Sequence, residues 1–217
     1  MDLFNLIDSD STILTPNRRL AATLANQFNH LNYTHENTCW QSLDILPLPN
    51  WLQRLWLEYS SSEISSIPLL LTDNQKNILW DVILRHSPAS QLLLQVRETA
   101  SLAESAHDLL KLWKIPLSDP ALVTTEDSQV FQEWAKQFQK TCQKNNWIYN
   151  TELPDILTEK IELGKIHLPK KIIMAGFTEI SPQHTFLLET CEKAGARVIY
   201  YNAKRHIESI KKISLLD

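Results

Sequence analysis

Residues 171–201 read KIIMAGFTEISPQHTFLLETCEKAGARVIYY. The apolar run at 172–175 is typical of a strand that is buried in a parallel sheet. Ser181 is a favoured N-cap residue followed by a proline, which the first position of a helix accepts, and Gly195 stands where that helix would end. The run at 197–201 is rich in β-branched and aromatic residues and predicts a second strand. This order of strand, helix and strand predicts a βαβ unit and therefore an α/β fold.

The first sixty residues show the same alternation. A β-branched run at 11–15 predicts a strand that ends at a Pro-Asn turn, and the spacing of large apolar residues over 18–30 predicts an amphipathic helix. A second strand is expected over 39–46, and Asn50 is expected to cap the helix that follows. This part of the chain is therefore expected to supply further strands to the same parallel sheet.

The residues between these two parts predict helices. Thr72 and Gln75 match a capping box, and the helix behind them is expected to bury one apolar stripe. Three more helices are predicted before Gly164. The predicted stripe is Ile78, Leu79, Val82 and Ile83, and the later helices span 91–113, 127–147 and 151–162.

These patterns divide the chain into an α/β core, residues 1–66 and 165–217, and a helical insertion, residues 67–164. Trp51 and Trp56 follow Asn50 at a spacing that separates them by about 140° around a helix. We therefore expect only one of these two tryptophans in the core.

Composition excludes several classes of protein. The 217 residues carry a net charge of −4, which argues against a protein whose whole surface binds nucleic acid but is compatible with one local basic groove. No apolar run approaches the roughly 20 residues that cross a bilayer, and the N-terminus lacks the pattern of a signal peptide. We therefore expect a cytoplasmic protein.

Cysteine and histidine spacing predicts no special chemistry. Cys39, Cys142 and Cys191 form no CxxC pair, so we expect reduced, buried side chains. The seven histidines show no spacing typical of metal ligands. We expect neither a metal centre nor a cofactor.

Two segments resemble a known family. The segment 12–24, TILTPNRRLAATL, resembles the strand, turn and helix that follow the nucleotide loop in UvrD-like superfamily I helicases and touch single-stranded DNA. The segment 172–188, IIMAGFTEISPQHTFLL, resembles the second phosphate-site strand of those motors. It is more similar to AddB-like subunits of bacterial helicase–nucleases, in which a strand ends in Asp-Gly-Phe and Thr-Pro-Gln opens the next helix. Together with the Trp-rich segment between them, these motifs resemble the N-terminal part of a bacterial family of probable DNA repair proteins.

This resemblance implies a RecA-like (P-loop NTPase-like) parallel sheet in a longer polypeptide that has a C-terminal PD-(D/E)XK nuclease domain. It implies contact with single-stranded or duplex-end DNA, and an ATP-dependent helicase–nuclease subunit as a partner. The residues that match the DNA-touching segment are Thr15, Asn17, Arg18 and Arg19. Ala175 stands where the family motif has its magnesium-binding Asp, and Gly176 stands where the motor has its Glu.

The sequence lacks residues that nucleotide hydrolysis requires. A triphosphate needs a glycine-rich loop whose backbone N–H groups surround the phosphates, but no glycine precedes Gly164. Ala175 cannot hold magnesium, and the first carboxylate behind it is Glu179, in the following loop. We therefore expect this segment not to be an enzyme.

Other interpretations stay open. The loop at Gly176 also fits a nucleotide-binding enzyme domain with a Rossmann- or flavodoxin-like core, and the chain could be a protein-interaction module that does not contact DNA. Arg18 and Arg19 fit a structural ion pair as well as they fit DNA phosphate contact. Thr15 and Asn17 are turn residues first, with DNA contact as the second interpretation.

Overall fold

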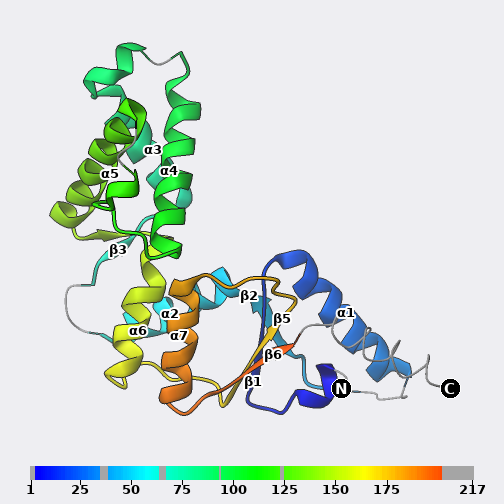
Figure 1. Ribbon diagram of the computed structural model, residues 1–217. Helices are drawn as coiled ribbons and strands as arrows, with labels where there is room; N and C mark the ends of the chain where they lie inside the picture. The colour runs from blue at the N-terminus through cyan, green and yellow to red at the C-terminus, as the bar shows by residue number, and fades with distance from the viewer. Residues whose placement is uncertain (1–2, 35–38, 64–66, 93, 123–124, 202–217) are drawn as a thin grey trace. The chain divides into compact units, whose positions relative to one another are not determined.

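The computed structural model describes residues 3–34, 39–63, 67–92, 94–122 and 125–201 (Figure 1). These residues have an α/β fold that divides into two compact units. The α/β unit comprises 1–58, 157–180 and 186–217, and the helical unit comprises 59–156 and 181–185. Both main boundaries fall inside helices, whereas the sequence division at 66/67 and 164/165 falls beyond the ends of those helices. Residues 202–217, part of the predicted core, lie outside the described residues.

The sheet of the α/β unit has four strands, and each of its ladders is parallel. The spatial order is β2-β1-β5-β6, and Ile13 of β1 lies opposite Ile45 on one side and Ile173 on the other. The strands are β1 (Ser11–Thr15), β2 (Asp44–Pro47), β5 (Lys171–Ala175) and β6 (Arg197–Tyr201). The predicted strands at 11–15, 172–175 and 197–201 are confirmed, whereas the second strand begins at Asp44 and not at residue 39.

Helices cover both faces of this sheet. Ile13, Ile173 and Ala175 form one buried cluster with Leu3, and Leu24 of α1 (Arg18–Thr34) packs against it. Because successive strand residues point to opposite faces, Leu14, Ile172 and Met174 lie on the other face. Figure 1 shows α1 on one side of the sheet and α7 (Pro182–Lys193) on the other.

Helix α2 (Leu48–Ser62) corrects two expectations. It begins two residues before Asn50, and both Trp51 and Trp56 are buried. The buried positions of α2 also include Leu48, Leu52 and Leu55, so its apolar face is wide enough to hold two side chains about 140° apart.

The helical unit is built from three helices and a small parallel sheet. Strands β3 (Leu69–Leu70) and β4 (Trp147–Ile148) pair with each other, and neither was predicted. The helices are α3 (Asp73–Arg85), α4 (Val96–Leu112) and α5 (Glu126–Asn145); α6 (Leu153–Glu162) begins in this unit after a 3-10 turn, Asn150–Glu152. Further 3-10 turns are Leu3–Leu6, Pro88–Leu92 and Pro120–Leu122.

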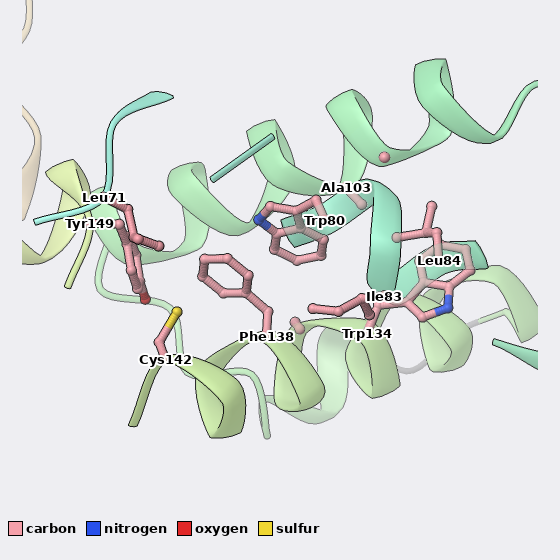
Figure 2. Close-up of a cluster of buried hydrophobic side chains, with 11 residues drawn as sticks. Leu71, Trp80, Ile83, Leu84, Ala103, Trp134, Phe138, Cys142 and Tyr149 are labelled. Carbon is pink, nitrogen blue, oxygen red and sulfur yellow. The ribbon is translucent and has the colours of Figure 1, made fainter. Parts of the chain in front are cut away.

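An aromatic cluster forms the core of the helical unit (Figure 2). The Trp80 and Phe138 rings stack with their centroids 4.7 Å apart. His107 and Tyr149 complete the cluster at centroid distances of 5.1 to 5.6 Å. Along α5, Trp134, Phe138 and Cys142 are buried in this core, and Phe131 packs against it.

The predicted stripe of α3 is confirmed at Ile83, which is buried, and at Leu79, which packs against the core, but not at its other two positions. The capping box at Thr72 is confirmed. Ile78 and Val82 are exposed by 63 % and 42 %, and the buried face instead contains Trp80 and Lys76. Lys76 tolerates burial because its ammonium lies 2.6 Å from the Asp108 carboxylate and 3.3 Å from Glu104.

The exposure of the cysteines and the polarity of the helices bear on two further expectations. Cys39 is exposed, whereas Cys142 and Cys191 are buried as expected, because Cys39 lies in irregular chain before β2. Among the described residues, every helix is too short or too polar to cross a membrane.

Candidate functional site

The carboxyl ends of β1 and β5 form the candidate site. Strand order reverses between these two strands, since the chain proceeds from β1 to β2 on one side and from β5 to β6 on the other. Open α/β sheets bind ligands at such a switch point, outside the carboxyl ends of the strands. Leu14 and Met174 lie opposite each other in the ladder, so Thr15 and Ala175 follow side by side. The two segments selected from the sequence therefore meet at one edge of the sheet.

The turn after β1 uses its polar groups to begin helix α1. The Thr15 hydroxyl donates to the Asn17 carbonyl oxygen at 3.0 Å, and the backbone N–H of Leu20 donates to the Asn17 Oδ1 atom at 2.9 Å. Asn17 is therefore the N-cap of α1. Thr15 is fully buried, so a ligand at this edge would meet the exposed Asn17 and not the Thr15 hydroxyl.

Arg18 and Arg19 are exposed in the first turn of α1. Within the part of the chain that the structure describes, neither guanidinium has an ion pair or a hydrogen bond, and the first turn contains no acidic residue. The partial positive charge of a helix N-terminus disfavours cations at this place. The described residues therefore offer no intramolecular stabilisation for this pair.

Gly176 lies against Leu20 of α1. Its φ of +79° is in the region that favours glycine, and a Cβ atom added there would lie 2.3 Å from Leu20 Cδ2. The Gly176 N–H donates to the Tyr201 carbonyl oxygen at 3.2 Å, which ties the loop to the end of β6. The leucine side chain therefore occupies the space next to the backbone at the end of β5. Sequence reasoning missed Leu20, because its i+4 spacing with Leu24 indicates only a helix face.

Ala175 is buried and ends β5 without a carboxylate. Glu179 is exposed in the loop that follows. Among the described residues, no group of three His, Cys, Asp or Glu side chains could hold a metal ion. The carboxyl ends of β1 and β5 therefore combine the positive charge of the two arginines with the apolar side chain of Leu20. In the described part of the chain, they carry no cluster of acids.

The acids nearest the sheet lie at its amino end and are already paired. Asp44, the first residue of β2, accepts both guanidinium nitrogens of Arg54 at 2.7 Å and the Thr12 hydroxyl at 2.6 Å. Burial alone would raise the pKa of Asp44, but the hydrogen bonds from Arg54 and Thr12 have the larger combined effect. The pKa of Asp44 is therefore lowered. Lys171, helped by Ser11, lowers the pKa of Asp8 to about 2.

Gln183, part of the Ser-Pro-Gln motif, has a structural position in the helical unit. It is buried, and its Nε2 atom donates to the Thr151 carbonyl oxygen at 2.8 Å and to Asp155 Oδ2 at 2.7 Å. Ser181 Oγ lies 3.0 Å from His184 Nδ1, and burial lowers the pKa of His184. Gln183 therefore ties the start of α7 to the segment that contains Thr151 and Asp155.

A comparison with protein-family models finds no match, and a comparison with curated proteins finds none either.

Proposed function

We propose that this chain is a non-catalytic, helicase-like region of a longer DNA repair or recombination protein, with a RecA-like sheet that acts as a scaffold and guides single-stranded DNA. One observation carries the proposal: Arg18 and Arg19 are exposed, without an acid partner among the described residues, at the switch-point edge of the parallel sheet. The proposal includes a cytoplasmic location, a C-terminal nuclease domain on the same polypeptide and an ATP-dependent helicase–nuclease partner that supplies motion.

The residues at the end of β5 support the part of the proposal that excludes nucleotide hydrolysis. Phosphoryl transfer depends on charges placed around the phosphates and their magnesium. Ala175 brings no carboxylate to that position, and Leu20 fills the space beside Gly176. A phosphate would have to displace the leucine side chain before it could approach this backbone.

DNA contact is supported by the chemistry of the arginine pair. Guanidinium groups bind phosphate oxygens through two parallel hydrogen bonds. Asn17 holds the helix start that presents both residues. Such contacts fix the path of a DNA backbone but read no base sequence, which fits a guide.

A titration of fluorescein-labelled single-stranded DNA, followed by anisotropy at several salt concentrations, tests the arginine pair. Arg18→Ala/Arg19→Ala should make the slope of log K against log salt shallower by about 1.4, because each lost single-strand phosphate contact contributes about 0.7. Lys165→Ala/Lys193→Ala removes the same charge from other exposed positions of the α/β unit and should leave the slope unchanged. Absence of binding at low salt would favour the protein-interaction module, and magnesium-dependent ATP hydrolysis by the chain would refute the proposal.

The strand order favours one other function, a nucleotide-binding domain. The order β2-β1-β5-β6 has the reversal at which doubly wound sheets bind nucleotides. A rise in melting temperature with ATP or a dinucleotide would support this function over the scaffold. Leu20→Ala should enhance that rise, because it empties the space beside Gly176.

A further inference from the structure

A row of three lysines runs along helix α5 in the helical unit. Lys136, Lys140 and Lys144 are four residues apart, which places them about 6 Å from one another along the helix and within about 80° of its circumference. All three are exposed, and within the described ranges their ammonium groups have no ion pair or hydrogen bond. Lys144 lies in the last turn, where a helix favours a cation, but Lys136 and Lys140 do not. The stability of the helix therefore does not explain the three lysines.

Most other basic residues of the helical unit have acid partners, and Arg97 of α4 is an exception among the described residues. Arg85 lies 2.7 Å from Asp81 across one turn of α3. Lys111 lies 3.6 Å from Glu152, and buried Lys76 has the two partners described above. The exposed row on α5 differs from these paired residues in having its charge available to a ligand.

Two adjoining grooves lie along α5, and Lys136 is the lysine of the row that lines the first of them. The first has a volume of about 510 Å³, and its walls include Lys111, Lys114, Lys136 and Gln139. The second has a volume of about 460 Å³ and shares Lys111 and Gln139 with the first. Gln143, one turn beyond Gln139 on α5, extends the wall of the second groove.

The electrostatics of the first groove favour an anion. Its lining includes one acid, Asp155, which lies 3.9 Å from Lys114. The second groove has no excess of cations, because Lys111 lies there with Asp155 and with Glu152, 3.6 Å away. His107 adds no positive charge, because burial, helped by Lys111 and Lys76, lowers its pKa to about 3. Lys136 therefore leaves the first groove with positive charge that its own acids do not offset.

An aromatic side chain lies in the second groove. Trp147 of β4 is half-buried, packs against the core of the helical unit and forms part of the groove wall. Proteins that bind single strands without reading sequence combine a basic groove for the backbone with aromatic faces on which bases stack. The α5 row, the grooves and Trp147 provide these elements in one unit.

We propose that the helical unit binds a single-stranded nucleic acid along α5, with phosphates on Lys136, Lys140 and Lys144 and with a base on Trp147. The regular spacing of the cations suits a ligand whose charges repeat at regular intervals, and the indole suits a base better than an acidic peptide. The choice of nucleic acid as the ligand rests on the function proposed above. The surface itself is separate from the arginine pair of the α/β unit.

The test titrates the full chain into fluorescein-labelled oligothymidylate and follows anisotropy at several salt concentrations. Lys136→Gln/Lys140→Gln/Lys144→Gln should make the salt slope shallower by about 2. Its melting temperature should stay unchanged, because the three side chains are exposed. Lys165→Gln/Lys170→Gln/Lys193→Gln removes the same charge from exposed positions of the α/β unit and should leave the slope as it was. Trp147→Leu should weaken binding about fivefold or more without a change of slope.

The outcomes separate this proposal from the preceding one. A normal slope in the α5 triple variant, with a reduced slope in Arg18→Gln/Arg19→Gln, would overturn the α5 surface and leave the arginine pair standing. The reverse pattern would support the α5 surface alone. If oligothymidylate does not bind the native chain at low salt, both proposals fail. Polyglutamate that binds as tightly as the oligonucleotide would overturn the choice of nucleic acid as the ligand.

Discussion

The substitution Gly176→Ala is the sharpest test of the contact between Leu20 and Gly176 at the carboxyl end of β5. Alanine would have to adopt a φ of +79°, and a left-handed conformation costs a residue with a Cβ atom about 1–2 kcal/mol. Its Cβ would also lie 2.3 Å from Leu20 Cδ2, and the resulting overpacking costs a further 1–3 kcal/mol or so. We therefore expect the free energy of unfolding to fall by about 2–5 kcal/mol.

The steric part of this cost depends on Leu20. In Leu20→Ala/Gly176→Ala the overlapping methyl group is absent, so the double variant should be more stable than the sum of the two single effects predicts. The coupling energy should be about 1–3 kcal/mol, as for residues in direct contact. The remaining destabilisation by alanine at residue 176 should be the conformational cost of about 1–2 kcal/mol.

Urea unfolding followed by far-ultraviolet circular dichroism measures all these variants. Gly164→Ala is the matched control, because Gly164 has a φ of +67° but no atom within 4 Å of an added Cβ. It should lose only the conformational part. Strict additivity of the Leu20 and Gly176 effects, or equal losses in Gly164→Ala and Gly176→Ala, would refute the claim that Leu20 packs on the end of β5.

Two further predictions concern the core of the helical unit. Lys76→Met should lower the free energy of unfolding by about 3–5 kcal/mol, because it leaves Glu104 and Asp108 without their buried cation; a loss below about 1 kcal/mol in urea unfolding would show that the ion pairs are dispensable. His107 has a folded pKa of about 3, below its ordinary 6.5, so the unfolded chain binds the proton more readily and stability should fall as the pH drops from 6.5 towards 3. His107→Gln should flatten this part of the stability profile, and an unchanged profile would contradict a buried neutral imidazole.

Patterns between near neighbours along the chain predicted much of the fold. The strands at β1, β5 and β6 follow from short β-branched runs, and the start of α3 follows from the Thr72 capping box. These features depend on backbone preferences and on hydrogen bonds within three or four residues. The candidate edge was likewise predictable in part, because the segments at 12–24 and 172–188 contain strand ends that parallel pairing brings together.

Contacts between distant residues decided the rest. The buried face of α3 was misassigned in part, because the acid partners that allow Lys76 to be buried lie on α4, 28 and 32 residues away. Sequence spacing shows no such compensation. The pairing of β3 with β4 joins residues 69–70 to 147–148, two runs too short to be recognised singly.

The sequence by itself determined that this chain forms an α/β fold and has no glycine before Gly164, since folding cannot add a glycine that the chain lacks. Only the tertiary structure decided that Leu20 lies on Gly176 and that Arg18 and Arg19 remain exposed beside it. It also decided that Lys136 of α5 lines one of two adjoining grooves. The physical reason is that residue chemistry is local, whereas exposure, steric closure and charge compensation depend on which surfaces meet.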